Sequence, residues 1–365
     1  MSTSPVAETV AAHLDEFVAR VRRDDAEYGP DAALFLDAAA ATLQGGKRLR
    51  ARFCHDGWAA VAHRRAADAV EPASLWGLCA ALEIFQSAAL VHDDLIDNSD
   101  TRRGRPASHR ALEASHRAAG WSGDAEAFGR ASAVLLGDLL VAWSDDLLEE
   151  SLAGEAEAEA EAGRVRAEYA RMRRDVTVGQ MLDIAEESAW SVGPPAGQLE
   201  RALRVASLKS ARYSIEQPLV LGAVLAGADA EQLAVLRAFG RPVGMAFQLR
   251  DDLLGVFGDA SVTGKPAGDD LREGKRTALI AIARERLDAD DQRMLDAALG
   301  DVELSAQRIG EIQELIAATG APEHVEQLIT DYAERADSAL RDAPLDAAAV
   351  TDLRALATAA TSRSA

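Results

Sequence analysis

The chain has 365 residues, of which 48% are hydrophobic, so it is long enough to bury one large core or two ordinary ones. Its formal net charge of −21 disfavours binding of nucleic acid or anionic membranes to the general surface, because both carry negative charge. Cys54 and Cys79 lie in apolar segments and not at metal-ligand spacing, which predicts no disulfide framework and favours a reducing, cytoplasmic setting.

Helix-forming residues dominate the chain. Aromatic residues make up only 5%, and Ala, Leu, Glu, Asp and Arg fill most windows, which predicts an all-α fold. No shift in composition marks a boundary, so we expect a single helical domain over residues 1–365. It would comprise a motif-bearing core at about 40–285, C-terminal helices at about 286–356 and a frayed tail at 357–365. Helix breaks are expected where Gly, Pro and polar residues cluster, at 28–33, 120–125, 191–197, 227–229 and 258–270.

The opening stretch MSTSPVAETVAAHLDEF lacks the basic start and apolar run of a secretory signal.

The N-terminal part of the chain carries the first cationic motif. In GGKRLR, residues 45–50, two glycines would let the backbone approach an anion, with Lys47 and Arg50 projecting from the start of a helix. Taken alone, this motif is more typical of a turn with solvated side chains.

The longest apolar run, Leu75 to Val91, predicts a buried helix. It is interrupted by Glu83 and Gln86 and is short for a membrane span, so any membrane contact would be peripheral. Further along, the Ala/Glu run at 154–163 predicts a solvated helix or a mobile loop.

An acidic motif, HDDLIDNSDTRRG, follows that apolar run at residues 92–104. Asp93 and Asp97 are spaced i and i+4, so they share one helical face and can share divalent cations, and Asp94 adds negative charge. Arg102 and Arg103 offer planar donors suited to phosphate, which indicates an anion bridged to the metals. The alternatives are a solvated acidic helix end and a local set of surface salt bridges.

A second acidic pair, Asp251 and Asp252, follows Phe247 and Gln248 on another apolar segment. Carboxylates in such a helix are costly to bury without a cation, so a metal between two acidic helices is a reasonable partner; the alternative is a single exposed acidic turn. Lysines also recur where the chain is otherwise apolar or turn-like, at positions 209, 265 and 275. Two acidic helices with ordered cations predict a polyanionic ligand bound with metals.

In this order, the motifs GGKRLR, DDLID with RRG, GQMLD (179–183), KSARY (209–213), FQLRDD and TGK…GK (263–275) resemble those of the trans-isoprenyl diphosphate synthases, the polyprenyl synthetase family. The resemblance spans about residues 45–280. It implies a helical bundle around a central cavity, normally in a homodimer, with the aspartate motifs facing each other across three Mg²⁺ ions. Asp93 and Asp97 would hold two ions and Asp251 the third.

The resemblance also implies a role for each cation. Isopentenyl diphosphate would be bound by Lys47, Arg50 and Arg103, and the allylic diphosphate by Arg102, Lys209, Lys265 and Lys275, with Ser210 and Gln248 beside it. The aspartates named above, Asp94 and Asp252 included, would form the catalytic set with Lys209. The implied reaction is ionisation, condensation and elimination, with the departing pyrophosphate as the base.

Two positions depart from the family pattern. Gln86 stands where the family commonly has His, so it can donate a hydrogen bond in the isopentenyl site but cannot carry charge. Gly255 stands where the second motif often has a third aspartate, which would weaken metal binding there.

Product length in this family depends on side chains one turn before the first aspartate motif. Here these are Ala88 and Ala89, which leave room for a product longer than farnesyl, and Phe85 could close the space about 12 Å from Asp93. Geranylgeranyl diphosphate is therefore the expected product; the alternative is that both alanines only permit helix packing.

Three other functions compete with a synthase. A class I terpene cyclase would not need GGKRLR. A catalytically weak subunit of a heteromeric synthase would fit Gln86 and Gly255, but the aspartates and Lys47 are intact. A generic acidic cation-binding protein leaves the ordered basic positions unexplained.

Overall fold

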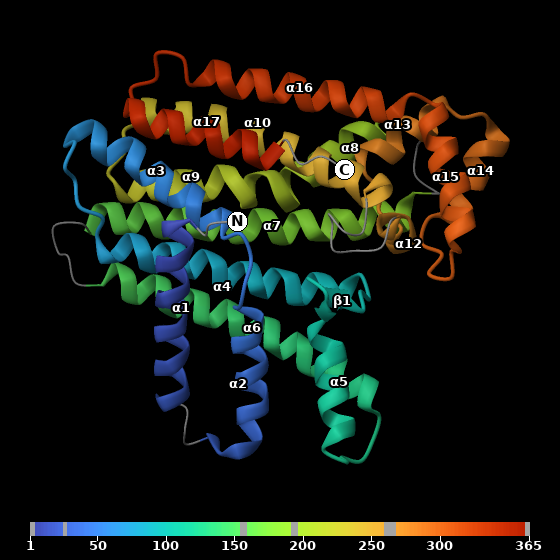
Figure 1. Ribbon diagram of the computed structural model, residues 1–365, viewed down its shortest axis with the longest axis horizontal. Helices are drawn as coiled ribbons and strands as arrows, with labels where there is room; N and C mark the ends of the chain where they lie inside the picture. The colour runs from blue at the N-terminus through green and yellow to red at the C-terminus, as the bar shows by residue number, and fades with distance from the viewer. Residues whose placement is uncertain (1–3, 25–27, 154–158, 191–195, 259–267, 362–365) are drawn as a thin grey trace.

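The computed structural model describes residues 4–24, 28–153, 159–190, 196–258 and 268–361 (Figure 1). The predicted all-α class is confirmed, and the only strands in these ranges are two of two residues each, β1 (Thr101–Arg102) and β2 (Arg105–Pro106). The helices of the first half are α1 (Pro5–Asp24), α2 (Pro30–Thr42), α3 (Leu49–Arg65), α4 (Ala73–Ile96), α5 (Ser108–Ala118), α6 (Ala125–Leu152) and α7 (Glu159–Ala189).

The second half continues without strands. Its helices are α8 (Gln198–Val205), the π-helix η3 (Ala206–Glu216), α9 (Gln217–Leu225), α10 (Ala230–Phe257), α12 (Asp269–Glu273), α13 (Ala278–Arg286), α14 (Ala289–Ala298), α15 (Ala306–Ala318), α16 (Ala321–Ala339) and α17 (Ala347–Thr361). The structure corrects the expectation for the C-terminal tail and describes only part of the Ala/Glu run. The tail expected to fray from residue 357 is helical through Thr361, because Leu356 and Ala360 are buried and hold the last turns. The Ala/Glu run is helical from Glu159, and residues 154–158 lie outside the described ranges.

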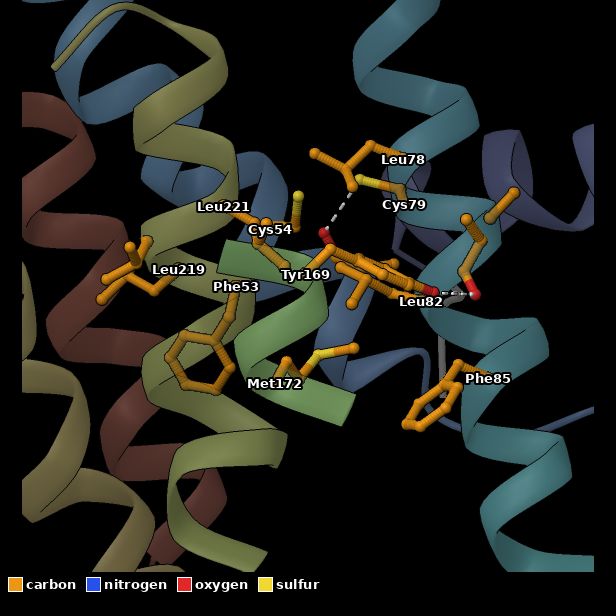
Figure 2. Packing of buried hydrophobic residues seen from close by; sticks show 14 of the residues in the cluster. Phe53, Cys54, Leu78, Cys79, Leu82, Phe85, Tyr169, Met172, Leu219 and Leu221 are labelled. Atoms are coloured by element: carbon orange, nitrogen blue, oxygen red, sulfur yellow. Dashed lines mark hydrogen bonds between the residues drawn. The ribbon is translucent and has the colours of Figure 1, made fainter. Parts of the chain in front are cut away.

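Long helices run side by side through the molecule (Figure 1). α4 packs along α6, α3 along α9, and α10 contacts both α16 and η3. Their shared core contains many buried side chains, among them Phe53, Leu82, Met172 and Leu219. Figure 2 shows Leu82 and Met172 between α4, α7 and α9. Burial of this apolar surface is the main stabilising term of the bundle.

The predicted buried helix is confirmed as α4. By length and composition it could cross a membrane, and it is the one such helix among the described residues, but 72% of its apolar window is buried inside the fold. Asp93 lies near its C-terminal end and Asp97 is its C-cap. The core helix of the bundle therefore also positions the first aspartate motif.

Two glycines allow α3 and α9 to cross in backbone contact. A Cβ at Gly222 would lie 2.8 Å from the carbonyl carbon of Cys54 and closer still to its oxygen. A Cβ at Gly57 would lie 2.9 Å from the carbonyl carbon of Leu219, again closer to the oxygen. Because backbone atoms fill both positions, no side chain can be accommodated without separating the helices.

We expect Gly222→Ala to lower the free energy of unfolding by about 1–3 kcal/mol or more, because the added methyl must push α9 off α3. Denaturant unfolding followed by circular dichroism measures this change. Gly310→Ala on α15 is the matched control, because a Cβ there meets no atom within 4 Å. Equal stability of the two variants would contradict the close crossing.

Candidate active site

The first aspartate motif lies among basic side chains from three other segments. The Lys209 Nζ atom lies 3.1 Å from Asp93 Oδ1, and the Arg102 Nη2 atom lies 3.5 Å from Asp93 Oδ2. Asp97 is close to a different lysine, with Lys275 Nζ at 3.2 Å from its Oδ2 atom. Asp93 and Asp97 therefore do not form a solvated acidic helix end, which was the first alternative to a metal site.

These cations set the charge of Asp93. Burial by itself disfavours the carboxylate, but Lys209, Lys275 and Arg102 outweigh burial and hold the pKa of Asp93 well below its ordinary value. Asp93 is therefore fully ionised at neutral pH. An ionised carboxylate is the form that binds a divalent cation.

Asp97 is in a different electrostatic environment. Burial raises its pKa to about 6, and the neighbouring charges of Asp93 and Glu273 act in the same direction against Lys275. The two aspartates of the motif thus differ in charge state when the solution is acidified.

The strands β1 and β2 form a hairpin that holds the two arginines of the RRG motif. Arg103 (φ 53°) and Gly104 (φ 71°) are both left-handed, as the two central residues of a type I′ turn require. Arg102 Nε donates to Asp94 Oδ1 at 2.7 Å, and the Arg102 side chain is only 25% exposed. The second alternative was a set of surface salt bridges. The ion pairs of Arg102 with Asp93 and Asp94 do exist, but they lie at the edge of the site and not on an open surface.

The KSARY motif lies in the π-helix η3, which the sequence did not predict. η3 positions Lys209, whose Nζ contacts Asp183 Oδ2 on α7 at 2.6 Å as well as Asp93. It also positions Tyr213, whose hydroxyl donates to Gln86 Oε1 at 2.5 Å. Wide helical turns of this kind are rare and frequently occur at functional sites.

The second aspartate motif lies on α10. Asp252 is buried, and burial raises its pKa to about 8 although Gln248 Nε2 donates to its Oδ1 at 2.8 Å. Asp251, one residue earlier, lines the same cavity as Asp93. The two acidic motifs therefore face a common space, as the resemblance implies.

That common space is a cavity of about 310 Å³. Nine of the predicted site residues line it, namely Arg50, Gln86, Asp93, Lys209, Ser210, Gln248, Asp251, Asp252 and Lys275. Eight others do not line it, namely Lys47, Phe85, Ala88, Ala89, Asp94, Asp97, Arg102 and Arg103. Lys265 lies outside the described residues.

The residues predicted to bind isopentenyl diphosphate are divided between two cavities. Arg50 lies in the central one, where its Nη2 donates to Ser214 Oγ at 2.7 Å and its guanidinium stacks 4.1 Å from the Tyr213 ring centroid. Arg103 lines an adjoining cavity of about 500 Å³. Lys47 does not project from a helix as expected, because α3 begins only at Leu49.

Sequence reasoning missed several residues of the central cavity. Asp183 belongs to the GQMLD motif but received no role, and only the fold shows that it shares Lys209 with Asp93. Arg276 also lines the cavity, and its Nε and Nη1 atoms are buried without a hydrogen-bond partner among the described residues. The sequence signal for Arg276 was its position next to Lys275, because adjacent cations can bind one phosphate group together.

The carboxylates present fit Mg²⁺. Asp93 Oδ1 and Asp97 Oδ2 are buried carboxylate oxygens, each ion-paired with one lysine, Lys209 and Lys275 respectively, and a divalent cation could bind the same oxygens. Within the described part of the chain, no three acidic, His or Cys side chains converge as a closed metal cage. Mg²⁺ does not require one, because it commonly combines one or two carboxylates with water and substrate phosphates.

The three residues predicted to limit product length lie on α4 beside the cavity. The Phe85 ring is buried, with its centroid 5.8 Å from that of Tyr213 and 6.3 Å from that of Tyr169. Figure 2 shows Phe85 on α4 and Tyr169 in the same part of the core. Ala88 is fully buried, and Ala89 is half-buried. Phe85, Tyr169 and Tyr213 thus form an aromatic layer. The Tyr213 hydroxyl of this layer donates a hydrogen bond to Gln86, which lines the cavity.

A helical bundle in which acidic and basic side chains from separate helices line one cavity is the architecture of a protein that binds a polyanionic ligand together with cations. The Polyprenyl synthetase family model matches residues 33–316, so the chain belongs to that family and is a prenyltransferase. The geranylgeranyl diphosphate synthase of Mycobacterium tuberculosis is 32% identical over 277 residues, which cover 76% of this chain and 70% of that protein. The geranylfarnesyl diphosphate synthase of Aeropyrum pernix is 31% identical over 267 residues, covering 73% and 76% respectively.

The fold has solved counterparts. A crystal structure of geranylgeranyl pyrophosphate synthase from Corynebacterium glutamicum, complexed with isoprenyl diphosphate and magnesium, has a TM-score of 0.92 and 39% sequence identity, and the match covers 100% of both chains. The predicted family, the helical isoprenoid-synthase fold and the enzyme class are thereby confirmed.

Proposed function

We propose that this enzyme condenses isopentenyl diphosphate with an allylic diphosphate, in a Mg²⁺-dependent reaction, to give a longer all-trans prenyl diphosphate. The observation that carries the proposal is the single cavity in which Asp93 and Asp251 face Lys209, Lys275 and Arg50. Relatives named as geranylgeranyl diphosphate synthases and the small Ala88 and Ala89 support geranylgeranyl diphosphate as the product.

The chain supplies binding and electrostatics for this reaction. Asp93 and Asp97 would hold two of three Mg²⁺ ions and Asp251 the third. Bound Mg²⁺ supplies charge neutralisation of the departing diphosphate. Lys209 and Lys275, each beside a first-motif aspartate, bind oxygens of the allylic diphosphate and stabilise the charge that it gains as its bond to carbon breaks.

The remaining side chains orient the second substrate and protect the cation. Arg50, fixed by Ser214 and Tyr213, binds isopentenyl diphosphate with Lys47 and Arg103. Gln86 offers its amide N–H₂ group to the same diphosphate while its oxygen accepts from Tyr213. Leu90 and Phe247 line the cavity with apolar surface, which excludes water that would trap an allylic cation.

The enzyme acts as a cytoplasmic homodimer in this proposal. Buried free thiols at Cys54 and Cys79 support a reducing compartment. Exposed apolar side chains support a partner surface: Leu135 on α6 and Met181 on α7 are each 61% exposed. A silent subunit or a class I terpene cyclase is the alternative if no elongation occurs.

The test is product analysis with radiolabelled isopentenyl diphosphate and each of dimethylallyl, geranyl and farnesyl diphosphate. We expect a labelled geranylgeranyl product with Mg²⁺ and none after chelation with EDTA, and activity should return when Mg²⁺ is added back. No elongation of any starter would overturn the proposal and favour the silent subunit. Release of a cyclic hydrocarbon from geranylgeranyl diphosphate alone would favour the cyclase.

A further inference from the structure

The GQMLD segment at 179–183 lies on α7, and its first and last residues both contact Lys209. Gly179 and Asp183 are four residues apart, so they share one face of the helix. Lys209 lies on η3, which packs against α7. The fold therefore gives the two ends of this motif a common partner, although the reaction proposed above uses none of the motif's residues.

Gly179 lies in contact with the backbone of η3. A Cβ built on Gly179 would lie 2.7 Å from the carbonyl carbon of Leu208 and 2.7 Å from the Cα of Lys209, and closer still to the Lys209 nitrogen. Real Cβ atoms do not approach backbone atoms this closely, so any side chain at position 179 would push η3 off α7. Because the displaced backbone is that of Lys209 itself, the ammonium group of Lys209 would move with it.

Asp183 holds the other end of the same lysine. Its Oδ2 atom lies 2.6 Å from Lys209 Nζ, and both side chains are largely buried, Asp183 being 13% and Lys209 19% exposed. Lys209 Nζ also lies 3.1 Å from Asp93 Oδ1, and these two aspartates are its only ion-pair partners among the described residues. In the proposed reaction Asp93 gives its oxygen atoms to Mg²⁺, so Asp183 is the partner that Lys209 keeps.

We propose that Gly179 and Asp183 are positioning residues for Lys209. The glycine admits the backbone of η3 next to α7, and the aspartate orients the ammonium group toward the diphosphate. This inference rests on the proposed function, in which Lys209 binds the allylic diphosphate. It accounts for a glycine and an aspartate one helical turn apart, because each of them fixes one end of the lysine.

Binding of inorganic pyrophosphate in the presence of Mg²⁺, followed by isothermal titration calorimetry on the full-length protein, tests the inference. Lys209→Ala should weaken pyrophosphate binding about 10-fold or more, as the loss of a charge-assisted hydrogen bond does. Gly179→Ala should reproduce most of this loss. Gly163→Ala on the same helix, where a Cβ meets no atom within 4 Å, should bind as the unaltered protein does.

Asp183→Ala separates positioning from charge. Removing a negative charge beside an anion site would by itself tighten pyrophosphate binding. A positioning role predicts the opposite, namely binding about 5-fold weaker or more while Lys209 is present, and none of that weakening in the Lys209→Ala background. The effect of Gly179→Ala should likewise vanish in that background, which a merely structural defect would not do.

Unchanged binding by Lys209→Ala or by a folded Gly179→Ala would overturn the inference, and so would unchanged or tighter binding by Asp183→Ala. Losses that persist at full size in the Lys209→Ala background would overturn it as well. Circular dichroism and the melting temperature show whether each variant is folded, and Asp183→Ala decides the question if Gly179→Ala is not, because it adds no bulk.

The unaltered protein separates this inference from the proposed function. If it binds pyrophosphate and elongates prenyl chains while the variants behave as it does, only the positioning roles fail. If it neither binds pyrophosphate with Mg²⁺ nor elongates, the proposed function fails with them.

Discussion

Asp93→Ala is expected to lower kcat by about 1,000-fold or more, with little change in the fold. Asp93 is ionised at neutral pH and lies between Lys209 and Arg102, so its loss removes the proposed metal ligand and the ion-pair partner that positions both cations. Removing one group that stabilises developing charge typically costs 10²–10³ in rate, and loss of a metal ligand adds to that. Steady-state elongation of farnesyl diphosphate at saturating Mg²⁺ measures the effect.

Two controls separate charge from folding. Asp93→Asn keeps the size of the side chain and should lose about as much activity as Asp93→Ala, because the negative charge is what binds the metal. Asp37→Ala on α2 removes an aspartate that is 65% exposed and paired with Arg22, and it should leave kcat unchanged. An Asp93→Asn enzyme that retains a tenth or more of the activity would contradict the role of Asp93 as a ligand.

Phe85→Leu is expected to lengthen the product by at least one isoprene unit. Phe85 packs edge-on against Tyr213 and Tyr169 in the layer beside the cavity, and a smaller side chain opens space behind Gln86. Ala89→Phe, one turn before Asp93 and next to the cavity-lining Leu90, should shorten the product to farnesyl diphosphate. Chromatography of the dephosphorylated products reads both changes directly.

The matched control for Phe85→Leu is Phe239→Leu. Phe239 is a buried phenylalanine of α10, 1% exposed, and unlike Phe85 it makes no ring contact with Tyr169 or Tyr213. Both variants should lose a similar amount of stability from the smaller side chain, but only Phe85→Leu should change the product. An unchanged product in both would mean that the aromatic layer does not limit chain length.

The features that could be predicted from the sequence are those that depend on local spacing. Asp93 and Asp97 are four residues apart, so their common helical face follows from helix geometry alone. The all-α class follows from composition summed over many residues. The single-domain organisation remains a prediction.

The rest of the site depends on contacts between distant segments. Lys209 lies between Asp93 and Asp183, which are far from it in the chain, and no spacing rule brings the three together. Asp270 falls in the helix break expected at 258–270, and its contact with Gly255 exists only because α12 packs on α10. The π-helix also escaped prediction, because ASLKSARYSIE has the composition of an ordinary α-helix.

The π-helical segment has a consequence for how this enzyme can evolve. η3 joins α8 to α9 without a break, and its wider turns set the angular phase between the two helices. Deleting one residue within Ala206–Glu216 would leave α8 and α9 intact yet rotate one relative to the other by about 100°. Either Lys209 would turn away from Asp93, or α9 would lose its close packing against α3. Selection should therefore tolerate substitutions in η3 more readily than any change in its length.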